Sequence, residues 1–159
     1  MKEKWSDLMC LFDIQHYQIP EIEALDWGRT KEQLYLFIQS YVRARERIGL
    51  VRLPKLDQSF SLFTEEISIS TISKQNPYYQ EYKTLHGLFI LGYSSILHPC
   101  RPEITERRRR IFLLRYFYGL PILLVSERIN YQRNVIIDES KQAVLQFTVA
   151  LNIHVQKES

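Results

Sequence analysis

The sequence predicts an all-α protein, in which an N-terminal helical region is followed by a C-terminal helix-turn-helix module. Apolar residues recur at three- and four-residue spacing before residue 50 and again after residue 76, which is the period of an amphipathic helix. Hydrophobic residues make up 45% of the 159 residues, with only five glycines and six prolines. This composition excludes collagen-like and broadly disordered classes and is typical of a folded domain.

A first helix is predicted to begin at Thr30, because Gln33 follows three residues later in the pattern of a capping box. Gly49 is its expected end, since glycine readily adopts the left-handed conformation that closes a helix. This helix defines an N-terminal helical region over residues 1–50. Its apolar stripe comprises Leu34, Phe37, Ile38, Tyr41, Val42 and Ile48.

Residues 51–76 are predicted to form a connector. Pro54 and several Ser, Thr and Gln residues interrupt the helical period. Within the connector, residues 67–72 alternate isoleucine with Ser and Thr as a short strand would. We therefore expect a partly extended link between two helical regions, of a length that is often functional or disordered.

Residues 77–159 are predicted to form a C-terminal DNA-binding domain, for the reasons that follow. Asn76 and Pro77 are suited to the N-cap and the first position of its first helix. A further helix is expected over residues 103–118, where Gly119 ends it. The stripe of the first of these helices comprises Tyr78, Tyr82, Leu85, Phe89, Tyr93 and Ile96.

The last two predicted helices, over residues 121–129 and 133–151, meet the steric demands of a helix-turn-helix. Ser126 is a small residue where the second helix would cross the first. Asn130 tolerates the positive φ that the turn requires. The wedge between the helices is expected to be filled by Val125, Ile129, Tyr131 and Ile136.

In this register the start of the second helix approaches base edges in a major groove of double-stranded DNA. Arg133 can donate two hydrogen bonds to guanine, and Asn134 can pair with adenine. Asp138 either accepts from cytosine or orients Arg133. The predicted base-reading residues are Gln132, Arg133, Asn134, Ile137 and Asp138.

The charge distribution favours an anionic partner at the C-terminal end. Residues 1–100 carry eleven Lys/Arg against twelve Asp/Glu, and residues 101–159 carry ten against six. The predicted phosphate contacts are Arg107, Arg108, Arg110, Arg128 and Lys141. Because consecutive residues point all around a helix, the alternative for the arginine run is a solvated face paired with Glu103 and Glu106.

Leu123 and Leu124 make the first helix of the motif more apolar than one packed face requires. Two explanations remain open for this pair. The helix is either buried against the N-terminal region, or it offers these leucines to a second subunit or to RNA polymerase.

Several stretches of the chain also resemble a known family. They read RRRIFLLRYFYG, SERINYQRNVIIDESKQAVLQFTVAL and, upstream, TKEQLYLFIQSYVRARERIG followed by LPKL. Residues 103–151 resemble the C-terminal part of the ArpU family of phage late-gene transcriptional regulators, which is similar to region four of bacterial sigma factors. The resemblance implies a cytoplasmic activator of phage or prophage late genes that acts at a promoter with RNA polymerase. Asn130 stands where the family usually has glycine and Asp138 where it usually has a basic residue, so a different DNA sequence is expected.

A homodimer is expected, because a dimer matches a repeated or palindromic site. Two other functions fit the same pattern. A DNA-packaging subunit similar to a small terminase would form rings, which the mass in solution distinguishes. A protein-binding adaptor with a vestigial helix-turn-helix is suggested by Asp138 and Glu139 and would show no salt-dependent DNA binding. No glycine-rich phosphate loop, nucleophile elbow or catalytic His/Cys pair is present, so no enzyme activity, cofactor or metal is expected.

The protein is expected to be soluble, without a membrane partner. The first seven residues lack the apolar core of a signal peptide. The longest weakly charged apolar stretch, residues 86–98, is shorter than the ~20 residues of a membrane span. Cys10 and Cys100 are expected to be reduced thiols, as in a cytosol.

Overall fold

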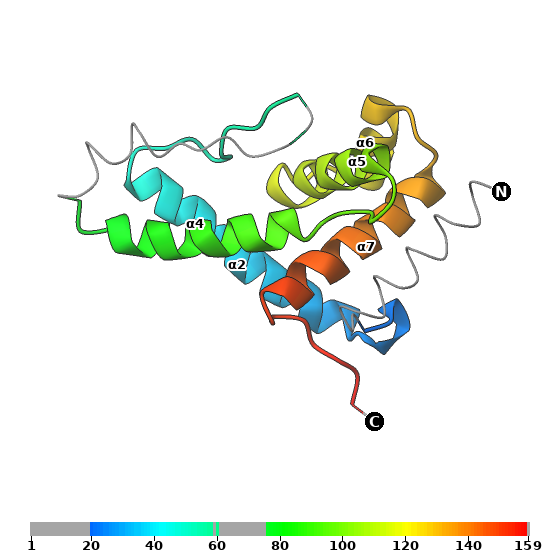
Figure 1. Ribbon diagram of the computed structural model, residues 1–159, viewed down its shortest axis with the longest axis horizontal. Coiled ribbons are helices and arrows are strands. Elements are labelled where there is room, and N and C mark those ends of the chain that lie inside the picture. Colours follow the sequence, from blue (N-terminus) through cyan, green and yellow to red (C-terminus); the bar gives the residue numbers. More distant parts are fainter. Residues whose placement is uncertain (1–19, 59, 61–75, 159) are drawn as a thin grey trace.

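The computed structural model describes residues 20–58, 60 and 76–158. The predicted all-α class is confirmed, because this part of the chain contains helices and no strand (Figure 1). Its β-bridge between Leu25 and Gln156 is isolated. The helical elements are η1 (Ile22–Ala24), α2 (Trp27–Arg47), α4 (Tyr79–Ser94), α5 (Pro102–Phe112), the π-helical η2 (Leu113–Phe117), α6 (Ile122–Ile129) and α7 (Arg133–Ala150).

The helix predicted to start at Thr30 starts three residues earlier, so the capping-box prediction is wrong. α2 begins at Trp27, and the side chain of Asp26 accepts a hydrogen bond from the Arg29 backbone N–H at 3.2 Å as its N-cap. Thr30 is instead fully buried. Its hydroxyl donates to the Val155 carbonyl at 3.2 Å and accepts from the Val155 N–H at 3.0 Å. These bonds fasten the C-terminal segment to the start of α2.

The second predicted helix also starts at a different residue. α4 begins at Tyr79 rather than at Pro77. The side chain of Asn76 accepts a hydrogen bond from the Tyr78 N–H at 2.9 Å, which forms a turn ahead of the helix instead of an N-cap. The predicted end of α2 is confirmed, since Gly49 follows the helix with a φ of 84°.

The remaining predicted helices are present, and one of them changes its pitch. The helix expected over residues 103–118 is divided into α5 and η2. In η2 the Tyr118 N–H donates to the Leu113 carbonyl at 3.0 Å, five residues earlier, as in a π-helix. α6 and α7 lie within one residue of the predicted ranges 121–129 and 133–151.

The first residues of the connector are held by two arginines. Arg45 is fully buried, and its guanidinium donates to the carbonyls of Val51 at 2.7 Å and Leu53 at 2.9 Å. Arg52 donates to the carbonyl of Phe117 at the end of η2 at 2.7 Å. The connector therefore begins as an irregular segment tied to α2 and η2. The short strand predicted within it lies outside the described residues.

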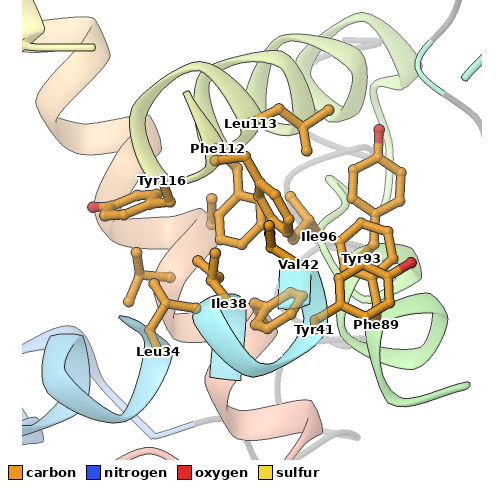
Figure 2. Close-up of a cluster of buried hydrophobic side chains, with 14 of the residues drawn as sticks. Leu34, Ile38, Tyr41, Val42, Phe89, Tyr93, Ile96, Phe112, Leu113 and Tyr116 are labelled. Carbon is orange, nitrogen blue, oxygen red and sulfur yellow. The ribbon is translucent and has the colours of Figure 1, made fainter. Parts of the chain in front are cut away.

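Helices from both ends of the chain share one hydrophobic core (Figure 2). The rings of Tyr41 and Phe89 stack with their centroids 4.8 Å apart, which joins α2 to α4. The rings of Phe112 and Phe147 lie 4.9 Å apart, which joins α5 to α7. The N-terminal helix therefore packs directly on the helices of residues 77–159. Other buried members of this core are Leu34, Ile38, Val42, Tyr93, Ile96, Leu113 and Tyr116.

α4 crosses α7 closely at Gly92. A Cβ atom at this position would lie 2.6 Å from the ring of Phe147, a separation that real Cβ contacts essentially never show. Phe147 is fully buried among other rings, so its side chain cannot move aside into solvent. The lack of a side chain at position 92 is therefore what allows the two helices to approach.

Cys100, in the loop between α4 and α5, is disulfide-bonded, so the predicted reduced thiol is wrong for this residue. Cys10 lies outside the described residues. None of the helices in the described ranges combines the length and the apolar composition that crossing a bilayer requires.

Gly92→Ala is expected to lower the free energy of unfolding by about 1–3 kcal/mol, because the added methyl group forces Phe147 or a helix to move. Gly87→Ala is the matched control on the same helix, since a Cβ there meets nothing within 4 Å. The control should gain up to about 1 kcal/mol from the better helix propensity of alanine. Urea unfolding measures both, and equal stability of the two variants would contradict a close crossing at Gly92.

Candidate nucleic-acid interface

The turn between α6 and α7 has the conformation that the sequence predicted. Asn130 follows α6 with a φ of 58° and a ψ of 44°, in the left-handed region. Gln132 then returns to an extended conformation, and α7 begins at Arg133. The hydroxyl of Ser126 donates to the Tyr131 carbonyl at 2.5 Å. Ser126 therefore ties α6 to the turn, a role beyond the small size for which the sequence singled it out.

A small second core holds α6 and α7 together. Ile111 of α5, Val125 of α6 and Ile136 of α7 are fully buried in it. Ile129 packs partly buried against this core, as predicted. The prediction that Tyr131 fills the wedge is wrong, because this residue is 41% exposed. Ile111 of α5 occupies the second core, where the sequence predicted Tyr131.

The predicted outward face of α7 is largely exposed. Ile137 is the exception, because it is half-buried. Arg133 and Asn134 make no side-chain hydrogen bond or ion pair with the rest of the described chain, so Asp138 does not orient Arg133 here. These two side chains are therefore available to a partner. The exposed residues on this face are Gln132, Arg133, Asn134, Asp138 and Lys141.

Arg107 and Arg108 do not lie where the phosphate prediction requires. The Arg108 Nε donates to Glu139 Oε2 at 2.8 Å, and the Arg107 guanidinium lies 3.4 Å from Glu139 Oε1. The side chains of Arg107, Arg108 and Glu139 are only 22%, 11% and 12% exposed. Both arginines face α7 because α5 packs across it, so we withdraw them as phosphate contacts. The alternative partners Glu103 and Glu106 are also wrong, since the carboxylate comes from another helix.

The other two arginines of the run differ from each other. Arg109 donates to the Ile96 carbonyl at 2.9 Å, and burial lowers the pKa of its guanidinium. Arg110 is exposed, and its guanidinium lies over the ring of Phe60 at 4.8 Å from the centroid. Of the four consecutive arginines, only Arg110 therefore adds a basic side chain to the surface.

The remaining predicted phosphate contacts are accessible. Arg128 is exposed in the last turn of α6, and Lys141 is exposed on α7. Glu127 and Asp138 are exposed on the same two helices. The surface around the start of α7 is therefore less basic than the formal charge of residues 101–159 indicates.

Leu123 and Leu124 are exposed rather than buried against the N-terminal region. Each of the two residues is 46% exposed. They follow directly on Leu120 and Ile122, which do pack against the second core. Burial of both leucines, one of the two explanations from the sequence, is therefore wrong, and an apolar strip is left on α6.

Sequence reasoning missed the structural role of Glu139, which it used only as a sign of a vestigial helix-turn-helix. Glu139 holds two arginines of α5 and so links α5 to α7. The sequence did contain a signal for this role. Glu139 lies three residues after Ile136 and four residues before Ala143, and both of these residues are buried. A carboxylate on the buried stripe of a helix is expected to have a cationic partner.

No protein-family model matches the chain, and neither characterised proteins nor solved structures give a match. Within the described ranges, no group of three His, Cys, Asp or Glu side chains is placed to hold a metal ion. A functional proposal therefore depends on the geometry of α5, α6 and α7 themselves.

Asn130→Ala is expected to lower the free energy of unfolding by about 1 kcal/mol, because alanine is strained in the left-handed region. Asn130→Gly removes that strain and should be at least as stable as the wild type. Asn134→Ala is a matched control in ordinary helical conformation and should change stability by no more than about 0.5 kcal/mol. Urea unfolding of the three proteins measures the difference, and equal stability of the two Asn130 variants would contradict a left-handed turn.

Proposed function

We propose that this chain is a sequence-specific DNA-binding transcriptional regulator, in which α6 and α7 form a sigma region four-like helix-turn-helix. The exposed start of α7 is the observation that supports this best. Arg133 and Asn134 follow directly on the turn at Asn130 and have no partner in the described chain. The other end of the same helix is fixed in the core at Phe147. Recognition helices enter a major groove in this way, as rigid rods with free polar side chains near their N-terminal ends.

The chemistry of this face suits base edges. The guanidinium of Arg133 can donate in parallel to O6 and N7 of guanine, and the amide of Asn134 can donate to and accept from adenine. Ile137 lies one turn after Arg133 and offers an apolar surface of the kind that contacts a thymine methyl group. Arg133, Asn134 and Ile137 thus offer three different kinds of base contact on one helix face. Together they are enough to distinguish one short DNA sequence from others.

The charged residues of this face favour binding to a specific DNA sequence over binding to DNA of any sequence. Arg128, Lys141 and Arg110 are exposed and are proposed to contact phosphates. Asp138 is exposed on α7 between Arg133 and Lys141 in sequence. Its carboxylate repels phosphate, so it is unfavourable on DNA unless it accepts a hydrogen bond from the amino group of cytosine. We therefore propose that the preferred site contains a cytosine opposite Asp138.

The biological role follows from the resemblance to the ArpU family. On that basis the protein is proposed to act at late promoters of a phage or prophage, together with RNA polymerase. The exposed pair Leu123 and Leu124 is proposed to meet a second copy of the chain in a homodimer. The mass of the protein in solution separates this dimer from the ring of a terminase-like subunit.

Selection of bound duplexes from a random library should return a preferred site for the wild-type chain. Arg133→Ala is expected to lose preference at one or two base pairs of that site. The loss should amount to about 1–3 kcal/mol, or about 5- to 150-fold in discrimination. The reason is that the variant can no longer donate the paired hydrogen bonds to guanine.

Arg43→Ala is the matched control for this experiment. It removes an exposed arginine from α2, outside the proposed interface, and should select the wild-type site. Uniform weakening on every sequence would mean that Arg133 contacts the backbone instead of a base. A wild-type chain without salt-dependent DNA binding would contradict the proposed function and favour the adaptor alternative.

A further inference from the structure

Arg107 contacts the chain on both sides of the exposed first turn of α7. Its guanidinium lies 4.8 Å from the ring centroid of Tyr131, the second residue of the turn that precedes α7. The same guanidinium lies 3.4 Å from Glu139 Oε1, within the second turn of α7. Between these two contacts lie Gln132, Arg133 and Asn134 (the exposed segment of the interface). None of these three side chains makes a hydrogen bond, ion pair or ring contact with the described residues.

We propose that Arg107 is a positioning residue for DNA recognition, which sets the direction of Arg133 and Asn134 without contacting DNA itself. The inference rests on the proposed function, because it assumes that these residues read bases. It replaces the phosphate contact that the sequence predicted for Arg107. It also assigns a purpose to Tyr131 and Glu139, which the base contacts do not use.

The turn is fixed at two different points of Tyr131. Its carbonyl accepts the hydrogen bond from Ser126 at 2.5 Å, which holds the backbone to α6. Its ring lies beneath Arg107, which holds the side chain to α5. Rotation of the turn about either contact is therefore opposed by the other. The direction in which α7 begins depends on both helices.

The contacts of Arg107 need a guanidinium. A planar guanidinium can stack its face on a ring while its edge donates to a carboxylate, whereas the ammonium of lysine is a point charge without such a face. The buried Nε of Arg107 has no hydrogen-bond partner among the described residues. An unsatisfied buried donor is unfavourable, so the contacts with Tyr131 and Glu139 are what hold this side chain in place.

The neighbouring Arg108 provides a contrast on the same helix. It shares Glu139 with Arg107, but its other contacts are the Leu97 carbonyl at 3.0 Å and the Gln146 amide oxygen at 3.4 Å. These contacts join α5 to the loop after α4 and to the C-terminal half of α7, remote in sequence from the turn. Arg108 therefore stabilises the packing of the helices, and Arg107 is the arginine that connects this packing to the turn.

The test compares Arg107→Met with the wild type on the selected duplex and on duplexes with one changed base pair. The variant is expected to lose about tenfold of discrimination at the pairs read by Arg133 and Asn134. The slope of log K against log salt should stay unchanged, because no phosphate contact is removed. A phosphate contact would instead lower the slope by about 0.9. Arg43→Met, on the surface of α2, should change neither quantity.

A second pair of variants keeps the test decisive if Arg107→Met fails to fold. Tyr131 is 41% exposed, so Tyr131→Leu should remain folded while it removes the ring beneath Arg107. It is expected to lose discrimination as Arg107→Met does, whereas Tyr131→Phe keeps the ring and should behave as wild type. Wild-type discrimination in Tyr131→Leu, or a reduced salt slope in Arg107→Met, would overturn the inference. Absence of any sequence preference in the wild type would instead contradict the proposed function.

Discussion

The close packing of Phe147 against Gly92 fixes α7, and the surface that α7 presents depends on it. A side chain at position 92 would meet the Phe147 ring at 2.6 Å, so α4 can lie on α7 only because none is there. Around the same ring are Phe37 at 5.6 Å and Phe112 at 4.9 Å, which bring α2 and α5 to the same point. Figure 1 shows the result, with α7 running from the core at one end to α6 at the other. One helix therefore serves as the centre of the core along one half and as an exposed polar face along the other.

Several arginines of this chain form internal contacts and therefore add little to the surface charge. Arg45 organises the start of the connector, and Arg107 and Arg108 hold Glu139. Arginine suits such positions because it keeps its charge and donates several hydrogen bonds in a fixed plane. The consequence is a modestly basic candidate interface that includes an exposed acidic residue, Asp138. Such a face gains little from general attraction to phosphate, so base contacts must supply much of its binding to a specific site.

Much of the fold followed from local patterns in the sequence. Helical periodicity placed α6 and α7 within one residue, and the left-handed turn at Asn130 followed from the conformational tolerance of asparagine. The errors came from contacts between residues distant in sequence. Thr30 is bonded to Val155 rather than capping a helix, and the run of four arginines turns mostly inward because α5 packs across α7. The exposure of the recognition face was predictable from the helical register of residues 133–151. The contact of α5 with the turn was not predictable, because it depends on how α5 packs against α6 and α7.

The central claim is that the segment from Asn130 to Lys141 is the surface that meets DNA. Hydrogen–deuterium exchange of the wild-type chain, free and bound to its selected duplex, tests this directly. The account predicts that bound DNA slows exchange at the backbone amides of the turn and of the first half of α7, and leaves the buried part of α4 around Gly92 unchanged. Binding that slows exchange only in other helices would contradict the account, and so would binding that leaves α7 unaffected.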